Sequence, residues 1–134
     1  MTTTETALWQ EYWAGVRNED WFAAARLLDA SLRVRGYFAC YLREELTPRL
    51  DEAGNEFGAT FRNVVLDWET AADRIHLDGF SSTEYRLARL VAALTAGQPF
   101  PIEDLARMGA WSRHVWQVLV EWGTDGTTTL QVQS

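Results

Sequence analysis

Asp73 and His76, in the stretch DRIH, have the three-residue spacing that lets two side chains of one helix share a metal ion. Helical di-iron proteins use an acid-x-x-His pair twice and add two further glutamates. The other histidine, His114, has no carboxylate three residues before it. We therefore predict no metal site, and we expect Asp73 and His76 to lie at a solvated helix end.

Cys40 is the single cysteine, and it lies in the apolar stretch FACYL. We expect an inert thiol there, because apolar surroundings disfavour the reactive thiolate. The sequence has neither a G-x-S-x-G motif nor a glycine-rich phosphate loop. Without a catalytic constellation, we predict a protein that is not an enzyme and uses no cofactor. A small-molecule pocket between helices, lined by Tyr37, Tyr41 and Trp68, stays open as an alternative without a polar anchor.

The stretch MGAWSRHVWQVLVEWG, residues 108–123, has helical spacing and three tryptophans. Its apolar side chains cover about half of the helix circumference or slightly more, which is wider than the stripe of an ordinary surface helix. Arg113, His114, Gln117 and Glu121 share the remaining face. Such a helix is either central to its domain or buried at one edge against a second chain.

Seven tryptophans in 134 residues favour an interface, because tryptophan is enriched in interface cores. The alternative is that a helical domain uses tryptophan to fill its own core. We predict a non-catalytic cytoplasmic protein that binds another protein, most simply as a homodimer. The candidate interaction surface is formed by Trp9, Trp13, Trp116, Val120 and Trp122.

Residues 82–122 resemble the winged-helix order of elements: a helix over 82–95, a short helix over 101–108, a turn at Gly109 and a helix over 110–122. Apolar residues fall where that family keeps them, at Met108, Ala110, Val115 and Val118. Leu105 departs from the pattern, since the family prefers alanine where the two helices cross. The resemblance implies a DNA-binding regulator that uses a helix-turn-helix at 101–122. Its DNA face would consist of Arg107, Arg113, His114 and Gln117.

The net charge of −7 disfavours nucleic acid and anionic lipid as partners, because phosphate repels an acidic chain. The charge is uneven: eight arginines face 14 acidic residues through Gly79, giving −6, and four face five afterwards, giving −1. No apolar run approaches the ~18 residues of a membrane span. The N-terminus does not read as a secretory signal and the one cysteine cannot form an internal disulfide, so we expect a cytoplasmic protein.

The hydrophobic pattern predicts a single all-α domain over 1–134 with five to six helices. Residues 1–79 form its long-helix part, with helices over 6–16, over 19–46 with a kink or break at Gly36, and over 57–79. Residues 80–123 form a trihelical part of helix-turn-helix-like shape, and 124–134 form a short β strand or a loose tail. Three signals mark helix ends: Asn18 as an N-cap, a capping box at Ser81 and Glu84, and a stop at Gly97.

Overall fold

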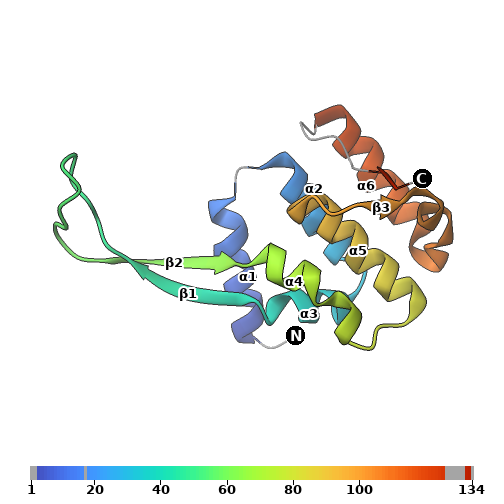
Figure 1. The fold of residues 1–134 in the computed structure, drawn as a ribbon, viewed down its shortest axis with the longest axis horizontal. Coiled ribbons are helices and arrows are strands. Elements are labelled where there is room, and N and C mark those ends of the chain that lie inside the picture. The colour runs from blue at the N-terminus through green and yellow to red at the C-terminus, as the bar shows by residue number, and fades with distance from the viewer. Residues whose placement is uncertain (1–2, 17, 126–131, 134) are drawn as a thin grey trace.

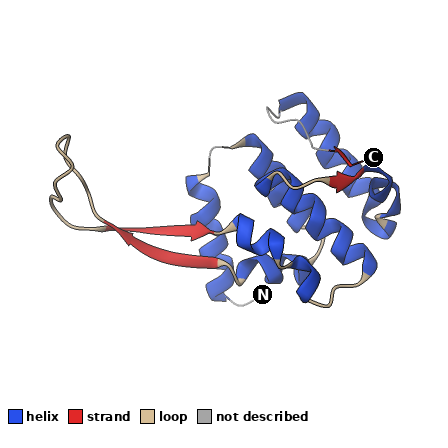
Figure 2. Ribbon diagram, in the orientation of Figure 1, coloured by secondary structure: helices blue, strands red, loops and turns tan. Residues whose placement is uncertain are grey.

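The chain forms a body of packed helices from which one long β-hairpin projects (Figure 1). The computed structural model describes residues 3–16, 18–125 and 132–133. Its helices are α1 (Thr3–Gly15), α2 (Glu19–Leu28), α3 (Leu32–Ala39), α4 (Trp68–Asp73), α5 (Ser82–Ala96) and α6 (Ser112–Asp125), with the short 3-10 helices η1 (Ile75–Leu77), η2 (Ile102–Arg107) and η3 (Gly109–Trp111). Its strands are β1 (Leu42–Thr47), β2 (Phe61–Leu66), β3 (Phe100–Pro101) and β4 (Val132–Gln133). The protein is mostly helical, as predicted, with an antiparallel two-stranded sheet added (Figure 2).

The three predicted helix-end signals are confirmed. The Asn18 side chain accepts a hydrogen bond from the backbone N–H of Asp20 and begins α2. At the start of α5, the Ser81 hydroxyl accepts from the Glu84 N–H, and the Glu84 carboxylate accepts from the Ser81 N–H. Gly97 ends α5 with a φ of 70°, a left-handed conformation that glycine adopts at little cost.

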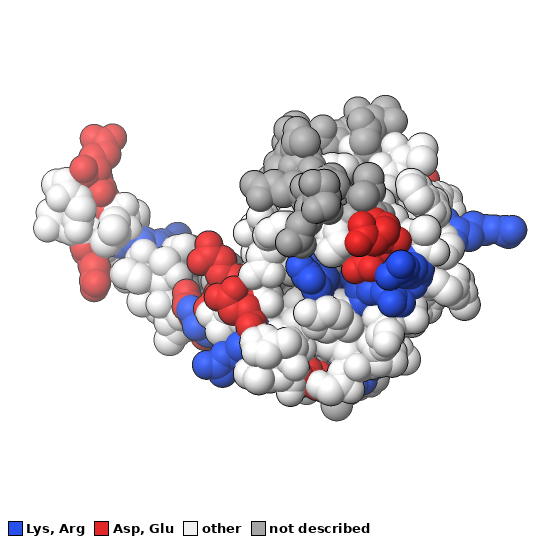
Figure 3. Space-filling model, turned by 45° about the vertical axis from the view of Figure 1, so that its right-hand side comes forward, with Lys and Arg blue, Asp and Glu red and all other residues white. Residues whose placement is uncertain are grey.

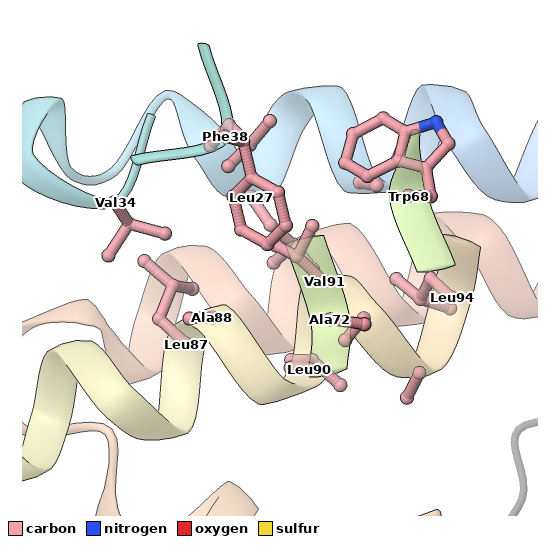
Figure 4. Packing of buried hydrophobic residues seen from close by; sticks show 14 of the residues in the cluster. Leu27, Val34, Phe38, Trp68, Ala72, Leu87, Ala88, Leu90, Val91 and Leu94 are labelled. Carbon is pink, nitrogen blue, oxygen red and sulfur yellow. The ribbon is translucent and has the colours of Figure 1, made fainter. Parts of the chain in front are cut away.

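Helix α5 is the central element of the core. Its residues Leu87, Leu90 and Val91 are fully buried. Figure 4 shows them packed against Leu27 of α2, Phe38 of α3 and side chains of α4. Most of the apolar material of the chain is therefore used to hold the body together.

An aromatic cluster joins α1 and α2 to α4. Trp9, Tyr12 and Trp68 are buried, with ring centroids of Tyr12 and Trp68 6.2 Å apart. The Trp68 indole N–H donates to the Tyr12 hydroxyl at 2.7 Å. Burial raises the pKa of Tyr12 to about 12, and the bond from Trp68 acts against this rise. Several of the seven tryptophans thus serve the core.

The predicted long helix over 57–79 is wrong. Residues 61–66 form strand β2, and the helix starts only at Trp68, where the Asp67 side chain accepts from the Thr70 N–H. Phe61 and Val65 are four residues apart, a spacing that places them on one face of a helix and equally on one face of a strand. The β-branched pair Val64–Val65 and the pairing with β1 favour the strand.

The predicted helix over 19–46 is also wrong. It is divided at residues 29–31 and not at Gly36, which lies inside α3. Ser31 causes the division, because its hydroxyl accepts from the Val34 N–H and caps α3. Residues 42–47 then form β1, which pairs with β2 from Leu42 opposite Leu66 to Thr47 opposite Phe61.

Strands β1 and β2 and the loop 48–60 between them form the projecting hairpin, here called the arm (Figure 1). At its far end the Asp51 carboxylate accepts from the backbone N–H groups of Ala53 and Asn55, both at 2.9 Å. Gly54 has a φ of 86°, which completes the turn. At the base, Val64 is buried and the Arg62 guanidinium bonds to Glu11 of α1 at 2.5 Å.

The C-terminal part has helical elements close to the predicted positions. The expected short helix over 101–108 is the 3-10 helix η2, and the expected helix over 110–122 begins as the 3-10 turn η3 before α6. Val132 and Gln133 form β4, which lies parallel to β3. In the segment 124–134, predicted as a strand or tail, residues 124–125 instead end α6, and residues 126–131 and 134 lie outside the described residues. No helix of the described residues is long and apolar enough to cross a membrane.

Candidate interaction site

The five residues of the predicted interaction surface lie in different surroundings. Trp9 is buried, and half-buried Trp13 stacks on it with ring centroids 5.6 Å apart. Trp122 is also half-buried. Trp116 and Val120 are exposed, to 49% and 68%. Of the predicted surface, these last two offer the most apolar area to a partner.

Trp116 and Val120 share one side of α6 with Arg113 and Gln117. The four residues are exposed and have the spacing i, i+3, i+4 and i+7, which places them along one side of a helix. We call them the α6 outer face. Val115 and Val118, on the opposite side, are buried in the core. The structure thus brings residues of the predicted protein-binding and DNA-binding sets onto one surface.

One edge of α6 is attached to α2. The Trp122 indole N–H donates to the buried Asp20 carboxylate at 2.5 Å, and His114 Nε2–H donates to the carbonyl of Arg26 at 2.6 Å. Glu121 forms an ion pair with the Arg26 guanidinium. His114 is therefore half-buried and turned toward α2, apart from the α6 outer face.

Two exposed arginines, one on the α6 outer face and one on the neighbouring helix η2, carry unneutralised charge. Arg107 of η2 and Arg113 of α6 form no ion pair with any residue that the structure describes, although six other arginines do: Arg26, Arg33, Arg35, Arg43, Arg62 and Arg86. Glu103, also on η2, is exposed as well. The end of the molecule that holds η2 and the α6 outer face has more free positive charge than the acidic chain as a whole suggests.

The arm is a second candidate surface, and it was absent from the sequence prediction. It exposes four large hydrophobic side chains, with Leu46 the most exposed at 74%; the others are Leu50, Phe57 and Phe61. Scattered exposed hydrophobic residues are ordinary, but four on one narrow projection are not. Two signals in the sequence point to the arm: the β-branched pair Val64–Val65 in FRNVVL, and the turn residues of DEAGN between the two strands.

Charges on the arm differ between its strands and its tip. Along the strands, Arg62 bonds to both Glu44 and Glu11, and Arg43 pairs with Glu45. The hydrogen bond from Arg62 lowers the pKa of Glu44 below its usual range. The tip loop 48–60 holds Arg49 against three acidic residues, Asp51, Glu52 and Glu56, for a net charge of 1 − 3 = −2. Figure 3 shows carboxylate side chains at the far end of the arm.

A polar cleft of about 320 Å³ lies where η1 meets α5, and it contains Asp73 and His76. The Asp73 carboxylate accepts from the Gln98 amide at 2.8 Å, and the Arg89 guanidinium donates to the Pro99 carbonyl at 3.0 Å. Both Asp73 and His76 are exposed. No group of three histidine, cysteine or acidic residues within the described part of the chain is placed to hold a metal ion. The cleft has polar and charged walls, but its polar groups largely bond to each other or to the backbone.

Cys40, Tyr37 and Trp68 lie in surroundings that differ from those predicted. Cys40 follows the last residue of α3 and is exposed, not enclosed by apolar residues as predicted; its thiol donates to the Gly36 carbonyl at 3.4 Å. Tyr37 and Trp68, expected to line a pocket, are packed in the core. The Tyr37 hydroxyl donates to the Ala71 carbonyl at 2.5 Å, and burial raises the pKa of Tyr37 well above its usual value.

Comparison with protein-family models, curated proteins and solved structures finds no match to this chain. The chemistry of the two exposed surfaces, the arm and the α6 outer face, is therefore the basis for assigning a function.

Proposed function

We propose that the protein is a non-catalytic, cytoplasmic protein–protein interaction protein that forms a homodimer, with the arm as its main contact element. The observation that carries this proposal is the exposure of four large hydrophobic side chains on a projection that leaves the helical body. Such a concentration of apolar surface is typical of a binding element.

The arm leaves the helical body, so its outer part has little apolar burial to stabilise it. A two-stranded hairpin is at best marginally stable in water by itself, because too few side chains are buried for the backbone that is ordered. Near the body, the burial of Val64 and the ion pair of Arg62 with Glu11 of α1 supply this stability. Further out, Leu50 and Phe57 have no such cover, and burial of a large apolar side chain contributes roughly 1.5–3 kcal/mol. A partner that covers the outer arm would supply the missing burial.

The test is the molar mass of arm variants measured by light scattering. Leu50→Ser with Phe57→Ser should abolish the dimer and leave the circular dichroism of the helical body unchanged. Leu77→Ser is the matched control, because Leu77 is 71% exposed on the body, away from the arm. A dimer that persists unchanged in the arm variant contradicts the proposal.

A second candidate function is DNA binding by α5, η2 and α6, which follow one another in the helix-turn-helix order. The exposure of Arg107, Arg113 and Gln117 favours it, because arginine and glutamine can bond to base edges in the major groove. The attachment of His114 to α2 and the net charge of −7 weigh against it. If the protein binds DNA, its affinity for a duplex should fall steeply as the salt concentration rises. If no duplex is shifted in a gel even at low salt, this second function is ruled out.

A further inference from the structure

We infer that the arm tip of one copy docks on the α6 outer face of a second copy, and that the second copy does the same in return. This inference rests on the proposed homodimer and names its contact surfaces. Both surfaces belong to this chain, and they complement each other in apolar area, in charge and in position.

The apolar areas are of the size that a stable dimer needs. Leu46 and Phe61 lie on opposite faces of the hairpin, because Leu46 pairs with Arg62 and Phe61 pairs with Thr47, so the contact depends on the tip residues Leu50 and Phe57. These two are 56% and 53% exposed, and Trp116 and Val120 on the receiving surface are 49% and 68% exposed. With ~200 Å² for a large side chain, one junction covers about 450 Å² of apolar side chain and two cover about 900 Å². Because non-polar atoms make up about 57% of an interface, the total is about 1,600 Å², within the range of about 1,200–2,000 Å² for specific interfaces.

The charges of the two surfaces are opposite. The tip loop has a net charge of −2, and its one arginine, Arg49, lies over the Phe61 ring at 6.0 Å from the ring centre. The receiving end offers Arg107 and Arg113, neither of which is ion-paired within the described residues, with Glu103 as an opposing charge. An acidic apolar tip thus meets a basic apolar face, which selects this pairing over contact between two like surfaces.

The positions of the surfaces require two copies. The arm extends from the side of the body opposite to α6, so it cannot fold onto the α6 outer face of its own chain (Figure 1). In a two-fold symmetric pair, each arm passes along the other body toward its α6. Reciprocal contact of this kind closes at two chains, whereas one-way contact would continue into a filament.

Charge reversal at the two surfaces tests this docking. Glu52→Arg with Glu56→Arg changes the net charge of the chain from −7 to −3, because each replacement adds two charges, and so reduces the general repulsion between copies. We nevertheless expect the dissociation constant, measured by sedimentation, to rise about tenfold, since several surface ion pairs are lost and replaced by like charges. Arg107→Glu with Arg113→Glu should have the same effect. The four changes together should return the constant to within about threefold of the wild type.

Cross-linking between copies gives an independent test. In a Cys40→Ser background, chains with Ala53→Cys, at an exposed position of the tip loop, are mixed with chains that carry Gln117→Cys, and a short bifunctional thiol reagent is added. We expect a cross-linked pair that contains one chain of each kind, and none when Leu77→Cys replaces Ala53→Cys. If neither charge reversal changes the dissociation constant of the dimer and no such cross-link forms, the docking is overturned. The proposed homodimer then remains in place. A wild type that stays monomeric overturns both.

Discussion

Replacing Trp122 by phenylalanine tests whether α6 is an integral part of the body, fixed to α2 by its polar edge. The indole N–H donates to Asp20, whose carboxylate is only 2% exposed. Loss of a hydrogen bond to a charged buried group costs roughly 1.5–3 kcal/mol, and the smaller ring removes apolar contact worth under about 1 kcal/mol. We expect the free energy of unfolding to fall by about 3 kcal/mol, a large part of the 5–15 kcal/mol of a typical domain.

The assay is urea unfolding followed by circular dichroism, supported by thermal melts in which a domain of this size should lose about 10 °C. A double-mutant cycle with Asp20→Ala separates the hydrogen bond from the packing loss. We expect a coupling energy of about 1–2 kcal/mol between the two positions, because each variant alone already removes the bond. Strictly additive effects, or a Trp122→Phe variant as stable as the wild type, would refute the attachment of α6 to α2 through this bond.

Three further predictions concern the body. Leu90→Ala, in the centre of α5, should reduce the free energy of unfolding by about 2–5 kcal/mol in urea titrations, because Leu90 is fully buried; an effect below about 1 kcal/mol would contradict the central position of α5. Ser81→Ala should cost about 1 kcal/mol through the lost cap. Its partner Glu84 has a pKa held below the ordinary 4.5 by its bonds to Ser81, so the stability it adds is present above that pH and is lost as the pH falls through the lowered value. Glu84→Gln should therefore flatten the acid limb of the unfolding curve, and an unchanged limb counts against the capping box. Burial raises the pKa of Tyr12 from 10.0 to about 12. The contribution of the protonated Tyr12 side chain to the free energy of unfolding is therefore fully present below pH 10 and is lost as the pH rises toward 12. Ultraviolet titration should show its ionisation after that of exposed tyrosines, and ionisation near pH 10 in the folded protein would contradict its burial.

Local signals predicted helix ends well and the middle of the chain badly. Asn18, Ser81 and Gly97 act through hydrogen bonds or backbone conformation within a few residues, so their effect can be recognised in the sequence. Phe61 and Val65 fit a helix and a strand equally, because a four-residue spacing satisfies both periods. Only the distant partner strand β1 resolves the choice, and its own sequence, LREELT, has good helix formers in it. Pairing between residues so far apart is a tertiary effect that local patterns do not contain.

The candidate site shows the same division. The predicted interaction surface includes Trp116 and Val120, and both are exposed. The helical spacing of residues 108–123 does not show that Glu121 and His114 face α2, because this depends on how two helices pack. Trp9 could not be assigned to core or interface from its spacing, and it is in the core. The arm was missed together with the sheet that forms it.

The molar mass of the wild-type protein in solution tests the proposed homodimer most directly. Sedimentation equilibrium over a wide range of concentrations should show a shift from 15.3 kDa, the mass of one chain, to twice that mass, and the arm variant Leu50→Ser with Phe57→Ser should stay at the single-chain mass. A wild type that remains at 15.3 kDa at the highest concentration contradicts the account.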